Sequence, residues 1–113
     1  MIKIIITEEL FKDISKKFNK EEANEVIDLM ESLEENPFKG KLIGNIGGIV
    51  LKEIKYKKFR FYYITDGYKL KFLKTNELKY LIIKFVRMSE KKDQQKVIEE
   101  IKLVLRTLGE ESF

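Results

Sequence analysis

Residues 48–65 constrain the fold more than any other stretch, because they predict two antiparallel β-strands joined by a tight basic turn. Their sequence, GIVLKEIKYKKFRFYYIT, is rich in the β-branched and aromatic residues that strands favour. Charged residues interrupt it at Lys52, Glu53, Lys55, Lys57, Lys58 and Arg60. A sheet that carries so many cations needs an anionic neighbour, so we expect the function to lie on this hairpin.

Side chains alternate between the two faces of a strand, and this divides the predicted hairpin into two sets. The more apolar set is expected to pack on helices, and it consists of Val50, Ile54, Phe59, Phe61 and Tyr63. The other set is expected on an opposite, partly open face, and it consists of Glu53, Lys55, Arg60 and Tyr62.

The composition limits what the chain can be. Its 113 residues, 43% of them hydrophobic, predict one domain over residues 1–113, since a chain of this size buries about two thirds of its unfolded surface. Neither a long apolar run nor a signal peptide is evident, which predicts a cytoplasmic protein without a membrane partner. Because Cys and His are both absent, we expect no disulfide and none of the usual zinc ligands. Metal catalysis through carboxylates alone stays open but has no motif behind it, so no metal and no other cofactor is expected.

The formal net charge of +4 hides a strong internal asymmetry. Counting Lys and Arg against Asp and Glu gives 5 against 10 in residues 1–38, 13 against 3 in residues 39–89, and 5 against 6 in residues 90–113. The segment charges are therefore −5, +10 and −1, which favours a nucleic-acid partner, although an acidic protein fits the same field. Alternatively, the lysines only keep exposed strands soluble.

The first third of the chain predicts a strand and two helices. Residues 1–6 are short, apolar and β-branched, as in a buried strand. Thr7 is expected to cap the first helix, and Asn19 with Glu22 predicts a capping box for the second, which ends at Asn36-Pro37. The buried stripe of the first helix is predicted to consist of Leu10, Phe11, Ile14 and Phe18.

The remaining segments complete the predicted order. Glycines in residues 38–48 predict turns and a bulge, Asp66-Gly67 predicts a tight turn into a strand over 68–74, and residues 78–87 predict an apolar strand. Ser89 is expected to cap a last helix that stops at Gly109. The fold class is thus α+β, ordered β-α-α-β-β-β-β-α, with a twisted, mainly antiparallel sheet on a helical hairpin and a C-terminal helix.

Four short motifs, in this order and spacing, resemble the RelE/ParE toxin superfamily, with the HigB-like and RelE-like mRNA interferases as the nearest branch. They are Glu35-Asn36-Pro37-Phe38, Glu53-Ile54-Lys55, Phe59-Arg60-Phe61-Tyr62-Tyr63 and Phe85-Val86-Arg87-Met88-Ser89. The resemblance spans nearly the whole chain. It implies a RelE-like fold, metal-independent endoribonuclease activity on translated mRNA at the ribosome, and a cognate antitoxin protein as partner.

Metal-independent RNA cleavage needs a base, cations at the phosphate and an acid. Arg60 and Arg87, two of only three arginines, are the expected phosphate ligands, since a guanidinium grips phosphate through two bonds. Glu53 is the only acidic residue of the hairpin and is either the base or a structural partner of Lys55 or Arg60. Lys55 can serve as acid or base if neighbouring cations lower its pKa.

The residues expected to bind RNA are Lys52, Lys57, Lys58, Tyr56, Tyr62 and Lys91. Tyr56 and Tyr62 either stack on a base or pack within the sheet. Two other hypotheses stay open beside the endonuclease. One is a non-catalytic relative that binds nucleic acid, ribosome or gyrase, and the other is a protein that acts mainly as half of a complex.

Overall fold

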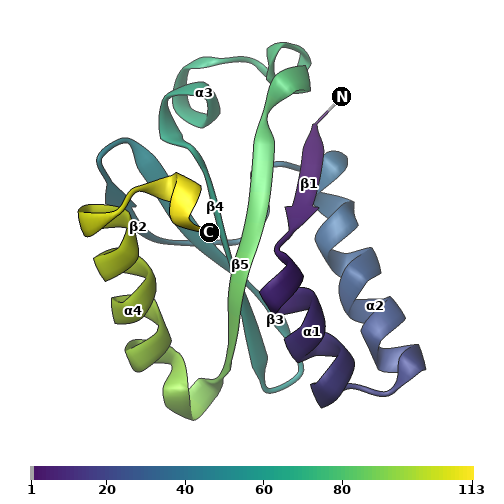
Figure 1. Ribbon diagram of the computed structural model, residues 1–113. Coiled ribbons are helices and arrows are strands. Elements are labelled where there is room, and N and C mark those ends of the chain that lie inside the picture. Colours follow the sequence, from purple (N-terminus) through teal and green to yellow (C-terminus); the bar gives the residue numbers. More distant parts are fainter. Residues whose placement is uncertain (1) are drawn as a thin grey trace.

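The computed structural model describes residues 2–113, apart from the side chains of residues 75, 76 and 79. One five-stranded sheet in the order β1-β5-β4-β3-β2 carries helices α1 and α2 on one face and α4 on the other (Figure 1). Strand β1 pairs with β5 in parallel and all other pairs are antiparallel. The sheet is thus mainly antiparallel, as predicted. The strands are β1 (Lys3–Ile6), β2 (Lys41–Ile46), β3 (Ile49–Tyr56), β4 (Phe59–Asp66) and β5 (Ile82–Glu90).

Helices α1 (Glu8–Lys17) and α2 (Lys20–Glu31) form the predicted helical hairpin. Both predicted caps are confirmed: the Thr7 hydroxyl accepts the Leu10 N–H at 3.3 Å, and Asn19 and Glu22 cap each other's backbone. Phe11, however, is 49% exposed rather than buried. It lies about 100° around the helix from Leu10, beside the line of residues that faces the sheet.

The alternation predicted for the hairpin is confirmed, and it produces two cores. Phe59, Phe61 and Tyr63 pack with α1 and α2, whereas Tyr62 and Ile64 face the other side of the sheet. That other face was expected to be partly open, which holds at Lys55 but is wrong for the buried Glu53, Arg60 and Tyr62. Helix α4 (Gln94–Thr107) covers it with Ile98, Ile101 and Leu105, because the apolar side chains of this face need a second layer.

The connection from β4 to β5 is helical, so the strand predicted over residues 68–74 is wrong. Helix α3 (Gly67–Phe72) begins where the Asp66 carboxylate accepts the N–H groups of Tyr68 and Lys69, at 2.9 and 3.1 Å. A 3₁₀-helix (Thr75–Tyr80) follows. Asp66 therefore acts as an N-cap, and the alternation of apolar residues with lysine occurs without a partner strand.

Two further differences concern the sheet and its last strand. Strand β2 lies within the stretch predicted as turns, and the predicted bulge appears between Leu42 and Gly44. Ser89 lies in β5 and does not cap α4, which follows a 3₁₀ turn (Lys91–Asp93). The predicted stop at Gly109 is confirmed, and its φ of +83° suits glycine.

Tyr63 gives the fold a predictable response to alkali. Its buried hydroxyl donates to the Lys39 carbonyl at 2.6 Å, and burial raises the pKa of Tyr63 above its ordinary value of 10.0. The folded state therefore keeps this proton at a pH where the unfolded chain has lost it, so the contribution to stability is complete below pH 10 and declines above it. Tyr63→Phe should cost about 1 kcal/mol at pH 8.

The measurement is urea unfolding of the parent and of Tyr63→Phe between pH 8 and 11, compared as a difference so that other titrating groups cancel. We expect the difference to shrink as the pH rises above 10. A constant difference across this range would contradict the assignment of the raised pKa to Tyr63.

Candidate functional site

The predicted catalytic residues lie on neighbouring strands. Arg60 of β4 is directly opposite Lys55 of β3, and Tyr62 is opposite both Glu53 of β3 and Arg87 of β5. Directly opposite residues of an antiparallel pair project from the same face. The sheet register therefore brings these residues to one face, near the β3–β4 turn.

Arg60 is nearly buried, with 7% of its surface exposed. Its Nη1 donates to the Phe59 carbonyl at 3.2 Å and, at 3.5 Å, to that of Lys57. Its Nε is buried and has no hydrogen-bond partner among the described residues. An unsatisfied buried N–H is costly, and an anion oxygen placed beside it would relieve that cost.

Glu53 is buried as well, at 2% exposure, and is connected to helix α4. Its Oε2 accepts from Nε2 of Gln94, the first residue of α4, at 3.2 Å. Within the described part of the chain the carboxylate forms no ion pair with Lys55 or Arg60. The partner of Glu53 is thus a neutral amide from an element that the sequence did not connect with the hairpin.

Tyr56 and Tyr62, the two tyrosines expected to bind RNA, have packing partners within the protein. Tyr62 is fully buried under α4, and its hydroxyl lies 2.8 Å from the Ser89 hydroxyl. Burial raises the pKa of Tyr62, partly opposed by the hydrogen bond to Ser89. The Tyr56 hydroxyl donates to Glu25 at 2.7 Å, and its ring meets Phe18 edge to face, with 5.8 Å between centroids.

The tip of the hairpin carries exposed cations. Lys57 adopts a left-handed φ of +54°, and its ammonium lies 3.3 Å from the Glu22 carboxylate, which raises the pKa of Lys57. Glu90 binds Lys58 and Lys92, each at 3.4 Å, and the hydrogen bond from Lys58 contributes most to lowering the pKa of Glu90.

Strand β5 ends beside this tip, where the Lys91 N–H donates to the Lys58 carbonyl at 3.1 Å. The side chains of Lys55 and Lys91 are exposed and form no ion pair within the described part of the chain. We call the exposed cations at this end of the sheet the basic rim. It consists of Lys55, Lys57, Lys58, Lys91 and Lys92.

Lys52 does not belong to the basic rim. It projects from the opposite face, is 7% exposed, and donates from Nζ to the Phe38 carbonyl at 2.9 Å. Burial lowers the pKa of Lys52. Its position indicates a structural role rather than the RNA contact expected from its place in the basic hairpin.

Lys52→Met is expected to leave the affinity for RNA unchanged within about twofold, because the ammonium is turned away from the basic rim. Met retains the length of the buried stem but loses one hydrogen bond, so the free energy of unfolding should fall by about 1 kcal/mol. Filter binding with a single-stranded RNA and urea melts would check this. Lys55→Met is the exposed control, and an equal loss of affinity in both variants would contradict the assignment.

Arg87 shares the face of Arg60 but contacts different groups. Its Nη1 donates to the Val86 carbonyl at 2.8 Å and lies 3.6 Å from the Glu9 carboxylate. Its guanidinium sits 5.1 Å from the centroid of the Phe113 ring. Arg87 therefore joins the start of α1 to the last residue, which the sequence motifs did not indicate.

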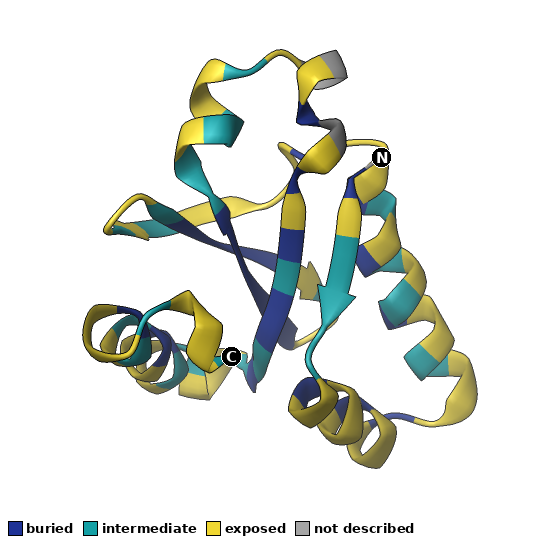
Figure 2. Cartoon of the chain, turned by 45° about the horizontal axis from the view of Figure 1, so that its top comes forward, coloured by how far each residue is buried: buried dark blue, intermediate teal, exposed yellow. Residues whose placement is uncertain are grey.

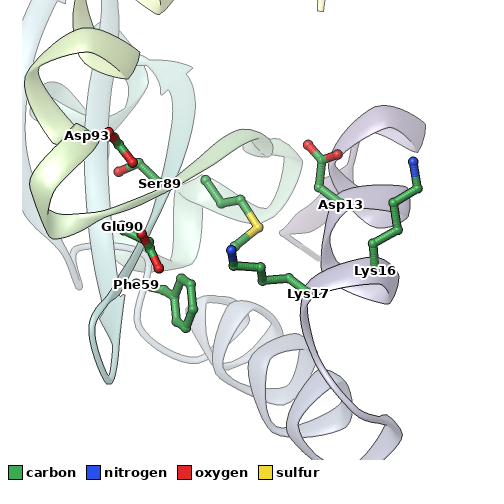
Figure 3. Close-up of a pocket in the computed structure, with 8 residues that line it drawn as sticks. Asp13, Lys16, Lys17, Phe59, Ser89, Glu90 and Asp93 are labelled. Carbon is green, nitrogen blue, oxygen red and sulfur yellow. The ribbon is translucent and has the colours of Figure 1, made fainter.

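A cleft of about 330 Å³ opens beside the hairpin tip (Figure 3). Figure 3 shows Lys17 extending from α1 into the space between its walls, and the Lys17 ammonium lies 5.8 Å from the Phe59 ring centroid. The lining residues are Asp13, Lys16, Lys17, Phe59, Met88, Ser89, Glu90 and Asp93. None of the α1 residues in this lining was among the predicted site residues.

Among the described residues, no three Asp or Glu side chains gather as a possible metal site. No helix in the part of the chain that the structure describes has the length and hydrophobicity to cross a membrane. The charged groups that the sheet register gathers near the β3–β4 turn include the carboxylate of Glu53, the ammonium of Lys55 and the guanidinium of Arg60.

The helical hairpin, the antiparallel β2–β5 strands and the C-terminal helix define a RelE-like α+β fold. The structure is similar to the archaeal RelE–RelB complex from Pyrococcus horikoshii OT3, with a TM-score of 0.59 and 15% identity over 80% of this chain and 94% of that one. It is also similar to the isolated E. coli RelE toxin, with a TM-score of 0.50 and 12% identity over 88% and 97%.

These similarities confirm the RelE-like fold that the motifs predicted, and they do not single out the HigB-like branch. The sequence itself matches no protein-family model and has no significant match among the curated proteins.

Proposed function

We propose that this protein is the toxin of a type II toxin–antitoxin system and cleaves translated mRNA on the ribosome. One observation carries the proposal: in a RelE-like fold, Arg60 and Glu53 lie on adjacent strands next to Lys55, which is itself part of the basic rim. The archaeal structure, a RelE–RelB complex, supports a cognate antitoxin as partner. We expect an acidic antitoxin segment to cover the basic rim, since opposite charge steers association.

In the proposed reaction the ribose 2′-oxygen attacks the adjacent phosphorus and the 5′-oxygen leaves, which forms a cyclic phosphate. Glu53 accepts the proton of the 2′-hydroxyl and Lys55 donates one to the leaving oxygen. Arg60 stabilises the charge that grows on the phosphate, using its unpaired Nε–H. The basic rim holds the flanking phosphates.

The burial of Glu53 and Arg60 supports a second candidate. Gln94 of α4 contacts the Glu53 carboxylate, and Arg60 is nearly buried as well, so RNA would have to displace the Gln94 contact to reach Glu53. A protein in which the contact persists would act as a non-catalytic relative that binds ribosome, nucleic acid or gyrase through the basic rim.

Induction in cells, with primer extension on a reporter mRNA, separates the candidates. The endonuclease should arrest growth and produce discrete cuts within translated codons, and coexpression of a neighbouring antitoxin reading frame should abolish both. Growth arrest without new 5′ ends would favour the non-catalytic binder, with gyrase supercoiling assays as the next measurement. Normal growth and intact mRNA would contradict the proposed toxin activity.

A further inference from the structure

The connection between β4 and β5 is longer than its topology requires. Antiparallel neighbours can be joined by two residues, yet residues 67–81 intervene here as α3 and a 3₁₀-helix. Long connections in compact domains often carry function. Figure 1 shows α3 at the end of the sheet opposite the β3–β4 turn, and Figure 2 shows much of this segment exposed.

Two aromatic rings of α3 project into solvent. Tyr68 is 66% exposed and Phe72 is 61% exposed, and their centroids lie 4.9 Å apart. They are four residues apart and therefore lie on one side of the helix. Neither residue belongs to the buried cores. Exposed rings in such a group commonly mark an interaction surface.

Lysines accompany these rings along the segment, and one of them contacts a ring. Residues 67–81 contain four lysines and one acidic residue, a net charge of +3. The Lys71 ammonium lies 5.3 Å from the Phe72 ring centroid, and Lys74 is exposed close by in sequence. Exposed rings among cations suit RNA, because unpaired bases stack on the rings while lysines bind phosphates.

We infer that α3 is a second RNA-contacting surface that binds unpaired bases of ribosomal RNA, an inference that rests on the proposed action at the ribosome. The mRNA strand that is cleaved is a less suitable ligand for α3. Arg60 and Asp66 stand at opposite ends of β4, about 20 Å apart. The hollow of about 370 Å³ beside α3 is lined by Lys69 and Lys84 but also by the carboxylates of Glu110 and Glu111, which would repel a continuous phosphate backbone.

The test measures the affinity of the purified protein for ribosomes without mRNA, with Arg60→Ala in every variant to prevent cleavage. Tyr68→Ser with Phe72→Ser should weaken binding at least about tenfold, since each stacked base contributes about 1–3 kcal/mol. Phe11→Ser, which removes an exposed ring of α1, is the matched control and should stay within about twofold. Thermal melts establish that each variant is folded.

If the double serine variant unfolds, a second double variant still tests the inference. Lys71→Ala with Lys74→Ala should reduce the slope of log affinity against log salt by about 1.4, because each phosphate contact contributes about 0.7 to that slope. Unchanged affinity and slope for folded variants would overturn the inference and leave the proposed function standing. If the parent binds ribosomes but the protein that retains Arg60 does not cut mRNA, the proposed endonuclease activity is wrong while the α3 surface still stands.

Other occupants give distinct outcomes. If the double variant loses affinity for a single-stranded mRNA oligonucleotide and not for ribosomes, α3 belongs to the substrate path and the inference is wrong. If it loses affinity only for vesicles of anionic phospholipid, the surface is a membrane contact, and the inference is again wrong. A parent protein that does not bind ribosomes would overturn both the inference and the proposed site of action.

Discussion

Arg60→Ala is expected to reduce the rate of mRNA cleavage by on the order of 10² to 10³, the usual loss when one donor to a developing oxyanion is removed. Arg60 is nearly buried and has an unpaired Nε–H, so its contribution should arise at the phosphate rather than in an ion pair. Arg60→Lys should restore only part of the rate, because an ammonium cannot form two parallel bonds with a phosphate. Primer extension with purified ribosomes measures the rate.

Arg106→Ala is the matched control, since this arginine is exposed on α4 away from the hairpin, and its rate should stay within about twofold of the parent. Glu53→Gln tests the proposed base, because the amide keeps the volume of the carboxylate but cannot accept the proton. A stable Arg60→Ala protein that cuts mRNA at the parent rate would remove Arg60 from the site.

Tyr62→Ala should lower the free energy of unfolding by on the order of 3–5 kcal/mol, the cost of deleting a large buried ring. Tyr62 has no exposed surface and fills the core between the sheet and α4, against Val86 and Ile98. Such a loss approaches the total stability of many small domains, so the variant should be largely unfolded at elevated temperature. Urea denaturation followed by circular dichroism measures it.

Tyr62→Phe separates packing from chemistry. It removes the hydroxyl bonded to Ser89 and should cost about 1 kcal/mol of stability while leaving cleavage near the parent rate. A folded Tyr62→Phe protein that has lost cleavage would instead show that the hydroxyl takes part in the reaction. A stable Tyr62→Ala protein would contradict the packing role.

The fold was predictable where local signals agreed with tertiary contacts. The alternation along residues 50–64 correctly assigned each side chain of the hairpin to its face, and the caps at Thr7 and Asn19 correctly placed two helix starts. The prediction failed at residues 68–74, where alternating apolar and lysine residues suggested a strand. There the Asp66 carboxylate accepts hydrogen bonds from the backbone N–H groups of Tyr68 and Lys69, and a helix begins instead.

The sequence predicted which residues of the candidate site are neighbours, but not how deeply they are buried or which distant residues they contact. Register on the two strands brings Glu53, Lys55 and Arg60 together, which follows from alternation and a tight turn. The environment of Glu53 depends on where α4 packs, because the amide that contacts it comes from Gln94, far from the hairpin in sequence. Similarly, nothing near Arg87 in sequence indicated its contacts with Glu9 and Phe113.

Because β1 pairs with β5, the sheet can be completed only late in the synthesis of this domain. Lys3–Ile6 is translated before the other strands of this domain, yet it pairs with Ile82–Phe85, so it has no partner strand until β5 has been made. Contacts between such distant segments slow folding, because a long loop must close before they form. The domain should therefore reach its native topology only after β5 has been synthesised, and a proteolysis time course on stalled chains would show protection of β1 appearing after β5 emerges.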